Sequence, residues 1–163
     1  MSDVGILGGM LNKRLGTPAE VAAFFALIDQ HKSKSSDGAL NLVTDRLFRR
    51  TVAGEQYDQL VEQLAQSREL LEEVRISDGF WDQFALGDRA VGIDRSATNA
   101  AEAFQKIFDS LEHAIDAARL DEKNLGYFRP LRLVAWESRK HYEHEEIPLE
   151  EFEKPDIRPI WLE

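Results

Sequence analysis

Residues 55–75, EQYDQLVEQLAQSRELLEEVR, decide the fold of this chain, because their apolar side chains recur at helical spacing. The apolar stripe consists of Tyr57, Leu60, Val61, Leu64, Leu71 and Val74. The opposite face carries Gln, Glu and Arg. This pattern predicts a long amphipathic helix that packs one face on a hydrophobic core.

Further helices are predicted on both sides of this stretch. Residues 17–20, TPAE, place a capping Thr before a Pro at the first helical position, with a Glu three residues after the cap. Asn99 and Glu102 form a second capping pair, and the apolar spacing that follows predicts a helix ending near Leu120. Residues 39–50 could form a helix or a strand, and the helical spacing of their apolar residues favours a short helix. The chain is therefore expected to be rich in helix.

Strand signals are shorter and lie near the two ends of this helical region. Residues 4–7 predict a buried strand closed by two glycines, and a helix is expected after that turn. Residues 131–136 have the β-favouring composition of another strand. We expect residues 76–94 to form turns and short strands whose aromatic side chains anchor them to the core. The prediction is one α+β domain over residues 1–163, helix-rich with a small sheet.

Charged residues are distributed unevenly along the chain. Residues 1–50 hold seven Lys and Arg against five Asp and Glu (+2), whereas residues 51–163 hold thirteen against twenty-five (−12). A net charge of −10 argues against nucleic acid or an anionic membrane as partner, because binding to either needs an excess of Lys and Arg. The composition favours a basic protein partner.

Acidic residues are most frequent in about residues 137–163, which we call the acidic segment. Three prolines in this segment argue against one continuous helix. Its last apolar residues, Ile160, Trp161 and Leu162 among them, are expected to dock back on the domain. Aromatic anchors inside a charged rim are typical of a protein interface. The interface predicted here comprises Tyr142, Glu143, Glu145, Glu146, Glu150, Glu151, Phe152, Glu153 and Asp156. An ordinary acidic surface is the alternative.

A second candidate surface lies on the helix predicted over residues 55–75. Glu69, Glu72 and Glu73 fall at helical spacing on the side opposite the apolar stripe. They form either a solvated helix face or part of an acidic binding surface.

The sequence does not match the patterns expected of a catalytic or metal-binding site. The chain has no cysteine, which removes thiolate nucleophiles and Cys-ligated metal sites. His141 and His144, with glutamates beside them, supply metal-ligand chemistry but lack the spacing of an H-E-x-x-H site, so a solvated acidic loop is favoured. No serine lies in a G-x-S-x-G context. We therefore expect neither an enzyme nor a bound metal or cofactor.

The sequence also predicts neither a signal peptide nor a membrane-spanning segment. The first residues lack the basic and long apolar regions of a signal peptide, and no run approaches the roughly 20 apolar residues of a membrane span. Together with the absence of cysteine, this composition predicts a cytoplasmic protein.

Several of these segments carry a family resemblance. The strand at residues 4–7, the capped helix start GTPAEV running into FFALI at residues 24–28, and the long helix after Leu47 and Phe48 resemble bacterial polymorphic-toxin immunity proteins of the contact-dependent growth inhibition type. The helix after Asn99 resembles that family's closing helix. The resemblance covers about residues 4–120 and leaves the acidic segment outside it.

The resemblance implies a non-enzymatic, cytoplasmic inhibitor that binds the C-terminal domain of a cognate toxin. Many such toxins are nucleases with basic substrate clefts, which an acidic protein can block sterically and electrostatically. Two alternatives stay open: an acidic adaptor or regulatory protein without a toxin partner, and a small metal-dependent enzyme using His141 and His144. The sequence leaves the toxin's identity, the stoichiometry and the oligomeric state unspecified.

Overall fold

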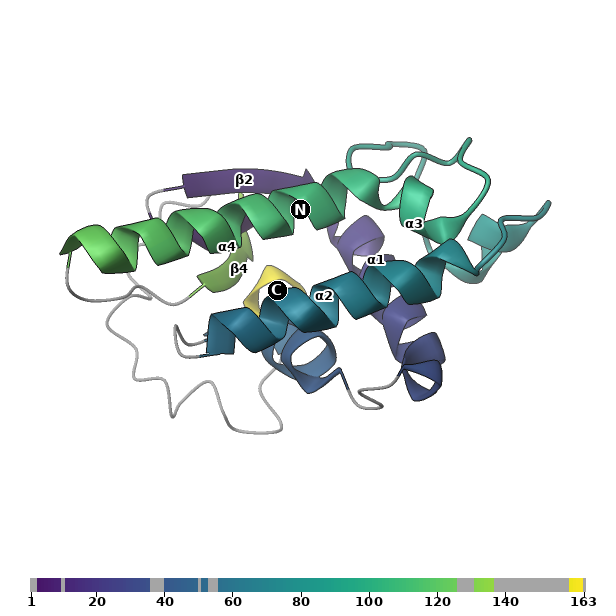
Figure 1. Ribbon diagram of the computed structural model, residues 1–163. Helices are drawn as coiled ribbons and strands as arrows, with labels where there is room; N and C mark the ends of the chain where they lie inside the picture. Colours follow the sequence, from purple (N-terminus) through teal and green to yellow (C-terminus); the bar gives the residue numbers. More distant parts are fainter. Residues whose placement is uncertain are drawn as a thin grey trace.

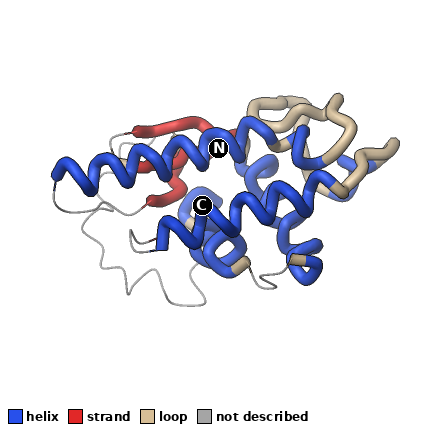
Figure 2. The backbone as a smooth tube through the Cα atoms, in the orientation of Figure 1, coloured by secondary structure: helices blue, strands red, loops and turns tan. Residues whose placement is uncertain are grey.

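The computed structural model describes residues 3–9, 11–35, 40–49, 51–52, 56–125, 131–136 and 159–162. Its helices are α1 (Pro18–His31), α2 (Tyr57–Glu72), α3 (Ala100–Ala103) and α4 (Gln105–Leu125). Its strands are β1 (Val4–Gly8), β2 (Leu11–Gly16), β3 (Thr51–Val52) and β4 (Leu131–Ala135). Shorter helical turns are η1 (Lys32–Lys34), η2 (Leu42–Leu47), η4 (Phe80–Gln83) and η6 (Ile160–Leu162). Helices dominate beside one small sheet, which confirms the predicted α+β class (Figure 1, Figure 2).

The sheet is antiparallel throughout, with strand order β2-β1-β4-β3. The strands predicted at residues 4–7 and 131–136 are confirmed as β1 and β4. The helix expected after the glycine turn begins at Pro18 as α1, but β2, which was not predicted, comes first and pairs back on β1. Gly9 has φ +59, the left-handed conformation that glycine adopts without strain, and it helps the chain to reverse between the two strands.

Helix α4 packs closely on β1 because Gly8 has no side chain. A Cβ at Gly8 would collide with the backbone carbonyl of Ala114, a fully buried residue of α4. β1 is buried along its whole length, and β4 is buried at four of its five residues. The sheet and α4 therefore share one core.

The middle of the core is aromatic and joins α1 to the closing helices. The Phe24 ring meets Phe104 and Phe108 edge-to-face, with centroid distances of 5.5 and 5.0 Å, and all three side chains are fully buried. Edge-to-face pairs add to the stability that burial of apolar area provides. These contacts confirm the apolar faces predicted for the helices.

Helix α2 lies alongside α4 in the antiparallel sense (Figure 1). Four of its predicted stripe residues, Tyr57, Leu60, Leu64 and Leu71, are buried, while Val61 and Val74 are half-buried. On the outside, Arg68 pairs with Asp109 at 3.0 Å and Arg119 pairs with Asp58. Apolar packing beneath and ion pairs above thus hold the two helices together.

The capping predictions held, with changes in helix length. Thr17 and Glu20 form the expected capping box at the start of α1. Asn99 accepts from the backbone N–H of Glu102, but it caps only the short α3, because the helix is interrupted at Phe104. α4 then runs to Leu125 rather than ending near Leu120. Of residues 39–50, residues 41–49 are helical, mostly as the π-helix η2, whereas Leu40 is not.

The end of the chain docks on this core, as predicted for Trp161. Its side chain is 2% exposed and its indole N–H donates to the carbonyl of Phe48 at 3.0 Å. The ring also lies 6.3 Å from Phe25 and 5.7 Å from Phe48. Trp161 therefore joins η6 to α1 and to the end of η2.

Candidate functional site

The structure describes only part of the interface that the sequence predicts. Tyr142, Phe152 and the seven acids between residues 143 and 156 lie outside the described residues, as do His141 and His144. Glu69, Glu72 and Glu73 are described, at the C-terminal end of α2. All three are exposed, so this part of the predicted surface is open to a partner.

The outer face of α2 is acidic because of its composition. The helix carries Asp58, Glu62, Glu69 and Glu72 against one base, Arg68, which is paired with residues of α4. Within the described part of the chain, the side chains of Glu69, Glu72 and Glu73 make no hydrogen bond or ion pair. Their charges are therefore not neutralised locally, which leaves them available to attract a cation.

Glu69 and Glu73 line the first of two hollows beside α2, with a volume of about 460 Å³. Because they are four residues apart, they lie on one side of the helix. The hollow lies between α2 and the end of α1, and its lining mixes apolar and polar groups. It is lined by His31, Lys34, Ser35, Gln66, Glu69, Leu70, Glu73 and Val74.

A histidine and a lysine form the far wall of this hollow. Lys34 Nζ lies 3.3 Å from His31 Nδ1, and Ser35 donates a hydrogen bond to Gln66 at 2.7 Å. Partial burial, and then the positive charge of Lys34, lower the pKa of His31 below its ordinary value of 6.5. His31 is therefore mostly neutral at pH 7, and the two glutamates face one nearby cation.

Glu72 lines a second hollow, of about 510 Å³, on the other side of α2. Its wall is largely polar and is shared with α3 and the start of α4. The lining residues are Arg68, Glu72, Asn99, Ala101, Glu102 and Gln105. The three predicted acids of α2 therefore belong to one exposed helix end but face two separate hollows.

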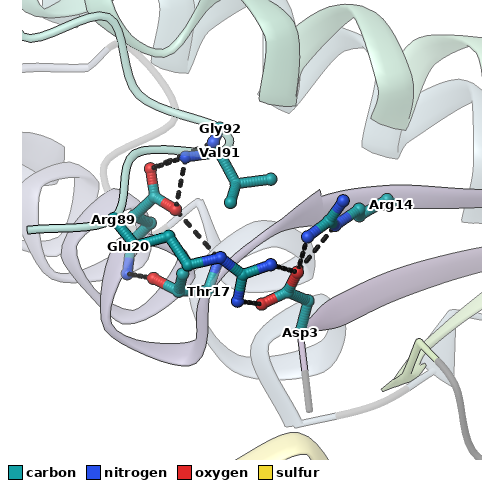
Figure 3. Close-up of polar contacts among 7 residues, drawn as sticks. All are labelled: Asp3, Arg14, Thr17, Glu20, Arg89, Val91 and Gly92. Atoms are coloured by element: carbon teal, nitrogen blue, oxygen red, sulfur yellow. Dashed lines mark hydrogen bonds and ion pairs between the residues drawn. The ribbon is translucent and has the colours of Figure 1, made fainter. Parts of the chain in front are cut away.

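A long irregular segment, the α2–α3 loop (residues 73–99), begins at this helix end and is held by a buried carboxylate. Glu20 is 0% exposed, and its side chain accepts hydrogen bonds from the backbone N–H groups of Val91, Gly92 and Ile93 at 2.8–3.2 Å. Figure 3 shows those from Val91 and Gly92. The Glu20 side chain also accepts from the N–H of Thr17 at 3.0 Å. These donors compensate the loss of water around the buried charge.

A second buried carboxylate fixes the same loop to the sheet. Asp3 is 6% exposed and binds both Arg14 of β2 and Arg89 of the loop (Figure 3). The Arg89 guanidinium binds Asp3 through two nitrogens, at 2.9 and 2.8 Å. Bidentate pairing of this kind fixes direction as well as distance. Glu20 and Asp3 thus hold the loop from two sides.

Sequence reasoning missed this pair of anchors. Glu20 was recognised only as a helix-capping residue, and nothing in the spacing of Asp3, Arg14 and Arg89 indicates that they meet. The one available signal is the apolar spacing of Val21 and Phe24, which on a helix places Glu20 at the edge of the buried face. Contacts between residues this far apart in sequence depend on the tertiary fold.

The described residues contain no group of three or more His, Cys, Asp or Glu placed to hold a metal ion. Within the same residues, no helix combines the length and apolar character that a membrane span requires. The geometry at α2 instead supplies exposed carboxylates beside shallow hollows, an arrangement suited to protein binding.

No protein-family model, curated protein or solved structure matches this chain.

Proposed function

We propose that this protein is an immunity protein, which binds and neutralises the C-terminal domain of a cognate bacterial toxin. The observation that supports this most directly is the exposed C-terminal end of α2. Glu69, Glu72 and Glu73 present carboxylates that no cation of the described chain neutralises. The resemblance of residues 4–120 to polymorphic-toxin immunity proteins supplies the class of partner.

Inhibition would be steric and electrostatic rather than chemical. A toxin that acts on nucleic acid needs a basic cleft to hold phosphates. The net charge of −10 draws such a cleft towards this protein and speeds capture, and the acidic surface then occupies the space of the substrate. This mechanism requires no catalytic residue, metal or cofactor in the inhibitor.

Co-expression with the toxin domain encoded beside this gene tests the proposal. We expect the chain to restore growth and to co-purify with a catalytically inactive form of the toxin. Binding without restored growth would favour the acidic adaptor instead. Neither binding nor protection, with both proteins folded, would refute the proposal.

Charge reversal then tests the role of α2. The double variant Glu69→Lys/Glu73→Lys should slow association with the toxin domain by about tenfold or more, because steering depends on local charge. Asp116→Lys/Glu122→Lys on α4 is a matched control with the same net charge. Equal association rates for the two variants would remove the α2 end from the interface.

A further inference from the structure

The α2–α3 loop has little regular secondary structure, and it is nevertheless firmly attached to the rest of the domain. Its Ile76 N–H donates to the Thr98 carbonyl at 3.1 Å, and its Asp94 N–H donates to the Ala103 carbonyl at 2.9 Å. Trp81 stacks edge-on against the buried Phe104 at 5.8 Å. With the Glu20 and Asp3 contacts added, the loop is anchored along most of its length. Long connections of this kind are uncommon in compact domains unless they have a function.

The charged side chains of the loop differ in their bonding among the residues that the structure describes: two arginines are hydrogen-bonded, and three aspartates are not. Arg89 binds the buried Asp3, and Arg95 donates to the carbonyl of Gly87 at 2.5 Å. Asp78, Asp82 and Asp88 are exposed. Their side chains make no hydrogen bond or ion pair with the part of the chain that the structure describes. Arg89 and Arg95 are thus hydrogen-bonded within the protein, although Arg89 and Arg75 are exposed like the three acids.

Aromatic side chains lie among these acids. Phe80 and Trp81 meet edge-to-face at 4.9 Å, and the Phe84 ring lies 6.2 Å from each of them. All three are half-buried, so each rests on the core and keeps part of its surface in solvent. Partly exposed aromatics within a charged rim have the composition of a protein interface.

We propose that residues 77–88 are an interaction surface that binds a basic patch on the partner protein. This inference rests on the proposed function, which makes that partner the cognate toxin. Charge complementarity selects a basic patch, because the exposed charges of residues 77–88 are all acidic. The Glu20 and Asp3 contacts hold this surface in shape before binding, so less conformational entropy is lost when the partner docks. The surface follows Glu73 along the chain, with the exposed Arg75 between Glu73 and Asp78.

Charge reversal and site-specific labelling test this surface with the inactive toxin domain from the neighbouring gene. Asp78→Lys/Asp82→Lys should slow association about tenfold and weaken its dependence on salt, because steering depends on exposed charge. The matched control is Asp116→Lys/Glu122→Lys. Since the chain has no cysteine, Asp82→Cys also accepts a single environment-sensitive fluorophore, with Asp116→Cys as control. The label at position 82 should respond to the toxin and the label at 116 should not.

Each outcome separates this inference from the proposed function. Slower association of the loop variant together with a response at position 82 supports the surface. Wild-type binding with unchanged loop variants, or slower association without a response at position 82, overturns the surface and leaves the immunity function standing. A wild-type chain that neither binds nor protects overturns both. Circular dichroism of every variant checks the fold, which matters most for the control, because Glu122 is half-buried whereas the other positions are exposed.

Discussion

The carboxylate of Glu20 lies 2.8 Å from the backbone nitrogen of Ile93, so the third residue of α1 holds a loop 73 positions away in the sequence. The backbone N–H groups of Val91 and Gly92, which precede Ile93, donate to the same Glu20 side chain. One buried charge therefore couples the start of a helix to a segment that no regular secondary structure supports.

Replacing this carboxylate should destabilise the protein. Glu20→Ala leaves four backbone N–H groups without their acceptor, and we expect a loss of about 3 kcal/mol or more, since each buried unsatisfied group costs about 1–3 kcal/mol. Glu20→Gln keeps the shape and should cost less. Urea unfolding measures both losses, and Glu62→Ala on the surface of α2 is the control. Equal stability of the Glu20 variants and wild type would contradict this account.

The aromatic core should be sensitive to truncation. Phe108→Ala removes a fully buried ring that contacts Phe24 at 5.0 Å, and we expect a loss of about 3–5 kcal/mol. Thermal denaturation provides the measurement. Phe80→Ala, at a half-buried ring, should cost clearly less. A smaller loss at Phe108 than at Phe80 would show that the core is not centred on this cluster. Loss of protection by Phe108→Ala is interpretable only after its fold has been checked.

The His31 and Lys34 pair predicts a pH effect of known sign. The folded pKa of His31 lies below 6.5, so the unfolded chain takes up the proton first as the pH falls. This residue therefore lowers the free energy of unfolding as the pH decreases from about 6.5 through the folded pKa. NMR titration of the His31 ring should give a midpoint below 6.5.

Removing the neighbouring charge checks the cause of that shift. Lys34→Gln should move the midpoint of His31 upwards without restoring it fully, because burial is the larger cause. Ser33→Gln, next to Lys34 and exposed, is the control. A midpoint that stays fixed in the Lys34 variant would assign the whole shift to burial.

The acidic segment carries a separate binding prediction. Reversing Glu145, Glu146, Glu150 and Glu151 to Lys should weaken binding of the toxin domain mainly through slower association. The fold should remain intact, because the predicted helical core lies elsewhere in the sequence. Surface plasmon resonance measures the two rate constants, and unchanged association with full protection would remove this segment from the interface.

The helices could be predicted from sequence because their signals are local. Apolar spacing and capping residues gave α1, α2 and the closing helix, although the interruption at Phe104 carries no such signal. β2 was missed because it is an edge strand whose sequence, LNKRLG, lacks a run of β-branched or aromatic residues. The strands expected among residues 76–94 were also wrong, since that stretch forms η4 and turns.

In the candidate site, too, the features set by local sequence could be predicted and those set by the tertiary fold could not. Exposure of Glu69, Glu72 and Glu73 followed from helical periodicity, because the buried stripe of α2 determines which side faces solvent. The hollows beside them could not be predicted, since they need the end of α1 and α3 as second walls. The pairing of Arg89 with Asp3 likewise depends on where the fold places Asp3.

The buried Trp161 changes how deletion experiments on this protein should be designed. A C-terminal truncation intended to remove the acidic residues would also remove an indole that is 2% exposed and hydrogen-bonded to Phe48. Such a shortened chain would lose part of its core, so its failure to protect could not be attributed to missing charge. The acidic residues are better treated as an insertion between two anchored ends, to be replaced in place by a neutral linker that retains Trp161.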